Sequence, residues 1–139
     1  EQDCKAIPGW TSVNAYGGVD RAFVREVMGR SLAGLVTFHP MPNHIAAQPN
    51  KMFEYMSAGI PVIASDFPLW REIVVGNGCG LCVDPMDPAA IAKAIDYLVQ
   101  HPDVARQMGE NGRRAVLRRY NWSVEEAKLL SFYKNILQA

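Results

Sequence analysis

The chain has 139 residues, of which 49% are hydrophobic and 20% are charged, a balance typical of one globular domain. Its fourteen basic and fourteen acidic residues give a formal net charge of zero, which argues against a nucleic-acid or anionic-membrane surface that works through bulk charge. No stretch approaches the roughly 18 consecutive apolar residues of a membrane span. Basic residues follow one another only in the pairs Arg113-Arg114 and Arg118-Arg119.

Strand-like and helix-like patterns alternate along the first half of the chain. The predicted elements are a strand, a helix, a strand and a helix, over residues 13–16, 20–30, 34–38 and 50–58. The first helix is indicated by apolar residues that recur every three or four positions. The nearly continuous apolar run 34–38 is typical of a strand covered on both faces. Pro49 suits the first turn of the second helix, and Gly59 is expected to end it as a left-handed cap.

The second half of the chain turns increasingly helical. A strand, a short helix and a strand are predicted over residues 61–65, 69–75 and 81–83. Two helices then begin at Pro88, with Asp87 as N-cap, and at Pro102. A capping box over Ser123 to Glu126 predicts a terminal helix. That helix is expected to bury Ala127, Leu130, Tyr133 and Leu137.

This order of elements predicts an α/β fold, with a Rossmann-like parallel sheet and helices on both faces. Four strands are few for such a sheet, and the chain begins without a Met. We therefore expect a fold truncated at its N-terminus, in which earlier strands are missing. An exposed sheet edge would follow, and self-association as a homodimer is its expected consequence.

Cys79 and Cys82 have the C-x-x-C spacing of zinc and redox sites. The nearest histidine, His101, has no partner at metal-motif spacing, and a redox pair needs a helix N-terminus that is not predicted here. We expect two small core residues and no metal site. An odd number of cysteines, three, indicates a reducing, cytoplasmic setting.

Ligands of an open parallel sheet bind beyond the carboxyl ends of its strands. Two loops qualify, over residues 39–48 and 66–70; in the second, Asp66 is expected to cap a helix. The first loop leads into the helix end at Asn50 and Lys51. Free N–H groups, the helix dipole and a lysine there predict a phosphate or diphosphate site.

Glu54 lies one turn further along the same helix and can share a face with Asn50 and Lys51. Its carboxylate is a suitable acceptor for two sugar hydroxyl groups, which suggests a nucleotide with its ribose on Glu54. The alternative is a surface ion pair between Glu54 and Lys51. The chain has no glycine-rich fingerprint, which argues against hydride transfer and P-loop hydrolysis.

Residues 49–65, Pro-Asn-Lys-Met-Phe-Glu-Tyr-Met-Ser-Ala-Gly-Ile-Pro-Val-Ile-Ala-Ser, closely resemble the signature of the GT-B retaining glycosyltransferases of family 4. The resemblance extends over most of the chain, from about residue 13 to 138. It implies that residues 1–139 are part of the C-terminal, nucleotide-sugar-binding domain of such an enzyme. Glu54 would hold the ribose, and Gln48 to Lys51 would face the diphosphate. It further implies that the sugar is transferred with retention of configuration at the anomeric carbon, and that the reaction uses neither a bound metal ion nor a cofactor.

The chain departs from that family at several positions. Ala46 stands where the family has a second glutamate that grips the donor sugar, so Asn43 and His44 are the substitute candidates for that contact. Trp70 is expected in the core rather than as a stacking surface. The basic residues near the leaving diphosphate have no match, and the acceptor-binding N-terminal domain is absent. We expect no catalytic residue in this chain and no activity of the chain alone.

The predicted function is transfer of a sugar, with retention, from a UDP- or GDP-linked donor to a glycan or lipid-linked acceptor. The expected setting is bacterial surface polysaccharide synthesis, such as capsule or lipopolysaccharide, in the cytoplasm or on the inner face of the membrane. One alternative is a sugar-nucleotide epimerase or phosphorylase of the same architecture. Another is a non-catalytic α/β binding module, although Asp66 and Asp84 do not form the acidic cluster of a receiver domain.

Overall fold

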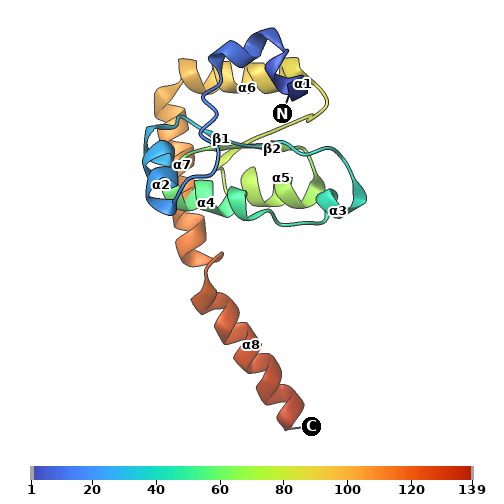
Figure 1. The fold of residues 1–139 in the computed structure, drawn as a ribbon. Coiled ribbons are helices and arrows are strands. Elements are labelled where there is room, and N and C mark those ends of the chain that lie inside the picture. Colours follow the sequence, from blue (N-terminus) through green and yellow to red (C-terminus); the bar gives the residue numbers. More distant parts are fainter. Residues whose placement is uncertain (1, 139) are drawn as a thin grey trace.

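A computed structural model, which describes residues 2–138, shows three parallel strands between helices (Figure 1). The sheet order is β1-β2-β3, with Gly34 beside Val62 and Val62 beside Gly80. The strands are β1 (Gly34–Val36), β2 (Val62–Ser65) and β3 (Gly80–Val83). The helical segments are α1 (Gln2–Lys5), η1 (Pro8–Ser12), α2 (Arg21–Arg30), α3 (Pro42–Ile45), α4 (Asn50–Ala58), α5 (Pro68–Val74), α6 (Pro88–Gln100), α7 (Pro102–Arg118) and α8 (Trp122–Leu137).

Side chains of the central strand β2 alternate between two cores. Val62 and Ala64 pack with Met52 and Met56 of α4 and with Trp70 of α5. Ile63 instead points to the other face, where it meets Ala94 and Leu98 of α6 and Ala105 of α7. Helices therefore cover both faces of β2 (Figure 1), and the predicted α/β fold class is confirmed.

Most predicted elements are confirmed with small shifts of their ends. Helix α2 begins after Asp20, whose carboxylate accepts a hydrogen bond from the Phe23 N–H at 2.8 Å. Asp87 caps α6 through the Ala89 N–H. Helix α4 ends at Gly59, which adopts the predicted left-handed conformation with a φ of 75°. These ends depend on local chemistry, so the sequence predicts them well.

The predicted strand over residues 13–16 is wrong. Val13 has extended backbone dihedrals, but its N–H donates to the Trp10 carbonyl and closes η1. An extended segment becomes a strand only when a neighbour takes its hydrogen bonds. Among residues 2–138, β2 is the sole strand neighbour of β1.

The strand predicted over residues 34–38 is confirmed only in part, and the expectation that it is covered on both faces is wrong. The strand β1 ends at Val36, and its middle residue Leu35 is 45% exposed while Gly34 and Val36 are buried. An apolar groove of about 320 Å³ opens beside Leu35, between β1, α2 and α4. Hydrophobicity alone does not report whether a second layer covers a strand.

The terminal helix α8 differs from its prediction in two ways. It begins at Trp122, and Asn121 rather than Ser123 caps it by accepting a hydrogen bond from the Val124 N–H. It also extends away from the rest of the chain (Figure 1). Ala127, Leu130, Tyr133 and Leu137 are therefore exposed rather than buried, since α8 has no core to pack against among the described residues.

Candidate functional site

Hydrogen bonds join the loop between β1 and α4 to the last residue of β2 at one end and to α5 at the other. The buried Ser65 hydroxyl accepts a hydrogen bond from the Phe38 N–H at 2.7 Å and donates to the Phe38 carbonyl at 2.9 Å. Nine residues after Phe38, the Ala47 carbonyl accepts a hydrogen bond from the indole N–H of Trp70 at 2.7 Å. Trp70 is fully buried against Phe67 and Phe38, which confirms its predicted place in the core. These bonds fix where the chain enters α4.

His44 lies inside this loop, in the short helix α3. Its Nδ1 is 2.9 Å from the His39 carbonyl, and its ring packs 5.0 Å from the Phe38 ring, between centroids. Asn43 beside it is exposed, as is Ala46 at the end of α3. His44 thus pins the loop, and the predicted contact of Asn43 and His44 with a donor sugar stays a prediction.

The N-terminus of α4 is open to a ligand. Pro49 is its N-cap and provides no side-chain cap. Gln48, Asn50 and Lys51 are exposed around this end. The first N–H groups of a helix have no partner within it and carry a partial positive charge. This geometry suits an anion with several oxygen atoms.

Glu54 is exposed one turn further along α4 and faces α2. It lines a hollow of about 510 Å³ together with Arg21, Arg25 and Ser57. No ion pair joins Glu54 to Lys51 or to either arginine within the described part of the chain. The alternative of a surface Glu54–Lys51 pair is therefore wrong, and the carboxylate is free to accept hydrogen bonds.

The six predicted residues do not share one hollow. Gln48 lines a separate one of about 260 Å³, on the side of Tyr120, Trp122 and Glu125. Phe53 lies between the two hollows and contributes to both. Arg21 and Arg25 are the residues that sequence reasoning missed, because only the packing of α2 beside α4 brings them near Glu54. The sequence does indicate that the two arginines share one face of a helix, because they are four residues apart.

The prediction that Asp66 caps α5 is wrong. Its carboxylate forms two hydrogen bonds with the Arg71 guanidinium, of which the Nε–Oδ1 bond is 2.7 Å long. The N-cap of α5 is Phe67, which has no side-chain cap. The ion pair raises the pKa of Arg71 mainly through this hydrogen bond. Asp66 is thus occupied at the mouth of β2.

The cysteine pair belongs to the core rather than to a metal or redox site. Cys79 is buried, with its sulfur 3.3 Å from the Val74 carbonyl, and Cys82 is half-buried in β3. Burial raises the pKa of each thiol to about 11. Among the side chains that the structure describes, those of residues 4–138, no group of three or more His, Cys, Asp or Glu could hold a metal ion.

Alkylation with iodoacetamide at pH 8 should modify Cys4, which is exposed, before either other cysteine. Thiolate is the reactive form, so a pKa raised from 9.0 to about 11 lowers the reactive fraction about a hundredfold. Mass spectrometry should find one fast adduct in the folded chain and three in urea. Rapid labelling of Cys79 in the folded chain would contradict its burial.

The raised thiol pKa also predicts how stability depends on pH. Cys79 and Cys82 keep their protons to a higher pH in the folded chain than in the unfolded one. The free energy of unfolding should therefore be unaffected by these thiols below pH 9 and should fall as the pH rises towards 11.

None of the helices in the described range has both the length and the apolar character needed to cross a membrane.

Comparison with known proteins identifies several relatives of this chain. The family model described as glycosyl transferases group 1 matches residues 8–115. The chain is 33% identical over 85 residues to a phosphatidyl-myo-inositol mannosyltransferase of Mycobacterium leprae, covering 61% of this chain and 22% of that protein. It is 36% identical over 81 residues to a GDP-mannose-dependent alpha-(1-6)-phosphatidylinositol monomannoside mannosyltransferase of Mycobacterium tuberculosis, covering 58% and 21%.

The fold is similar to that of sucrose-phosphate synthase from Thermosynechococcus elongatus, with a TM-score of 0.78 and 27% identity. That match covers 91% of this chain and 30% of the solved one. The likeness confirms the predicted Rossmann-like, GT-B type of architecture. This chain spans only about a fifth of the length of the two mannosyltransferases.

Proposed function

Because this chain belongs to the glycosyl transferases group 1 family, we propose that it is the donor-binding part of an enzyme that transfers a sugar from a nucleoside diphosphate sugar. The observation that carries this proposal is the arrangement on α4. An uncapped helix N-terminus is followed one turn later by an exposed, unpaired carboxylate, Glu54. The first group suits the diphosphate and the second suits the ribose.

The N-terminal end of α4 binds the diphosphate in this proposal. The N–H groups at Asn50 and Lys51 and the Lys51 ammonium hold the diphosphate. Gln48 lies at the same end and adds a polar contact. As the sugar departs, negative charge grows on the diphosphate, and the helix dipole stabilises it without a metal ion. Transfer with retention at the anomeric carbon is part of the same proposal.

The names of the relatives favour GDP-linked mannose over a UDP-linked sugar as the donor. One of them is called GDP-mannose-dependent, and the M. leprae protein is also a mannosyltransferase. The acceptor we propose is a glycan or a lipid-linked glycan of the bacterial surface. It would be bound by a second domain, and the enzyme would work in the cytoplasm or at the inner face of the membrane.

A second copy of the chain is the partner we propose for the open edge of β1. Leu35 is exposed there beside the apolar groove, and an unpaired strand edge offers N–H and C=O groups to another strand. Sedimentation that shows a compact monomer at high concentration would contradict this pairing.

Calorimetric titration of the chain with GDP and UDP tests the donor site. One nucleotide should bind, and Glu54→Gln should weaken its binding by about 1–3 kcal/mol, as expected for lost hydrogen bonds to a charged acceptor. Glu110→Gln is the matched control, since Glu110 is also an exposed helical carboxylate but lies on α7.

A nucleotide without ribose hydroxyls makes the test specific. Removing the 2′- and 3′-hydroxyls should weaken binding to the unmodified chain but not to Glu54→Gln, because the same contact cannot be lost twice. Equal losses in both proteins would show that Glu54 does not hold the ribose. If neither nucleotide binds, the donor-site proposal is contradicted.

A further inference from the structure

A basic hollow lies near the amino end of β3, at the end of the sheet opposite to the proposed donor site. It has a volume of about 550 Å³ and lies between the C-terminal half of α7 and the loop that connects α5 to β3. That loop leads into the amino end of β3, whereas the donor site lies at the carboxyl ends of the parallel strands. The lining residues are Gly76, Asn77, Asn111, Arg114, Ala115, Arg118 and Arg119.

The positive charge of this hollow is poorly balanced. Within residues 4–138, whose side chains the structure describes, the one carboxylate within 4 Å of these three arginines is Glu72, 3.7 Å from Arg119. Arg114 and Arg118 are one turn apart on α7, a spacing at which like charges destabilise a helix. The C-terminal end of a helix supplies only about half a negative charge. An anion in the hollow would relieve this repulsion.

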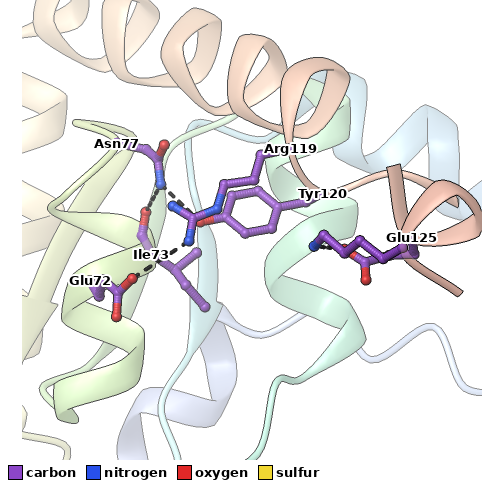
Figure 2. A network of polar contacts seen from close by, with 7 residues as sticks. Glu72, Ile73, Asn77, Arg119, Tyr120 and Glu125 are labelled. Carbon is purple, nitrogen blue, oxygen red and sulfur yellow. Dashed lines mark hydrogen bonds and ion pairs between the residues drawn. The ribbon is translucent and has the colours of Figure 1, made fainter. Parts of the chain in front are cut away.

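Contacts within the fold hold two of the three guanidinium groups in place. Arg114 donates to the Asn111 side-chain oxygen at 2.5 Å, while the Asn111 amide donates to the Gly78 carbonyl at 2.9 Å. Arg119 lies over the Tyr120 ring, near Asn77 and Glu72 (Figure 2). Because these side chains are already held in place, less conformational entropy is lost when a ligand binds them.

Arg118 completes the set and differs from the other two. It is exposed, and its side chain forms no hydrogen bond or ion pair with any described residue. Its five N–H donors are therefore all available. A planar guanidinium can bind two oxygens of one phosphate at once, and phosphate offers several oxygens and up to two negative charges.

We propose that Arg114, Arg118 and Arg119 form a binding site for a phosphate group, separate from the proposed donor site. The phosphate comes either from a soluble phosphorylated molecule or from the headgroup of an anionic lipid. The hollow lies between α7 and the loop before β3, so occupancy would join these two elements through the ligand.

Titration of the full chain with inorganic phosphate and pyrophosphate, at constant ionic strength with chloride as balance, tests the site. The NMR signals of the arginine Nε–H groups report on each side chain separately. We expect saturating shifts for Arg114, Arg118 and Arg119, and an affinity about tenfold lower in Arg118→Gln because one charge-assisted contact is lost. The Arg118 side chain has no partner in the fold and repels Arg114, so this variant should unfold at the same temperature as the unmodified chain or slightly above it.

Arg113→Gln is the matched control, because Arg113 is an exposed neighbour on α7 that does not line the hollow. It removes the same charge and should leave the affinity unchanged. Binding to vesicles with phosphatidylglycerol, compared with phosphatidylcholine alone, separates a lipid headgroup from a soluble phosphate. Equal losses in Arg113→Gln and Arg118→Gln would overturn the site in favour of bulk charge. The proposal would also be overturned if phosphate, pyrophosphate and vesicles all failed to produce saturating shifts in these three arginines. Shifts confined to residues 48–54 would report binding at the proposed donor site and would not support this one.

Discussion

Replacing Trp70 with alanine should lower the free energy of unfolding by about 3–5 kcal/mol, the usual cost of removing a buried aromatic side chain. Trp70 is fully buried and packs edge-on against Phe38 and Phe67. Its loss would also leave the Ala47 carbonyl without the indole N–H that it accepts. Urea unfolding followed by circular dichroism measures the change, since the tryptophan signal itself is altered.

Trp122→Ala is the matched control for this variant. Trp122 is 71% exposed at the start of α8, so its removal should change stability by no more than about 0.5 kcal/mol. Trp70→Phe keeps an aromatic ring but loses the N–H donor. Its loss of stability should lie between those of Trp122→Ala and Trp70→Ala. A stability loss in Trp122→Ala as large as in Trp70→Ala would contradict the described packing.

Gly109→Ala should destabilise the chain by about 2 kcal/mol, although alanine is the better helix former. A Cβ atom at this position would lie 1.9 Å from the Gly59 carbonyl oxygen, a backbone atom that cannot rotate away. Helices α4 and α7 would have to move apart at the point where Gly59 ends α4. Overpacking costs about 1–3 kcal/mol and occasionally more, and the helix propensity of alanine offsets about 0.5–1 kcal/mol of that.

The same substitution at Gly29 should have the opposite sign. Gly29 lies in α2, and a Cβ atom there would meet nothing within 4 Å. Gly29→Ala should therefore stabilise the chain by about 0.5–1 kcal/mol through helix propensity alone. Thermal unfolding of both variants checks the pair. Stabilisation by Gly109→Ala would show that α4 and α7 are not in such close contact.

The candidate site was only partly accessible to sequence reasoning. The helix end at Asn50 and Lys51 and the carboxylate of Glu54 follow from spacing along one helix, so their relative placement could be predicted. Arg21 and Arg25 could not be placed, because they come from α2 and meet Glu54 across a hollow. The same applies to the arginine hollow, whose lining residues come from α7 and from the loop before β3.

The sequence by itself determined the α/β class and most helix ends, because caps, glycine conformation and apolar periodicity act within a few residues. Tertiary structure alone decided which apolar surfaces are covered. Residues 13–16 form no strand, Leu35 is exposed on an apolar strand, and the apolar side of α8 is exposed along its length. Hydrophobic side chains favour burial without specifying the surface that buries them, and that choice depends on contacts between segments far apart in the chain.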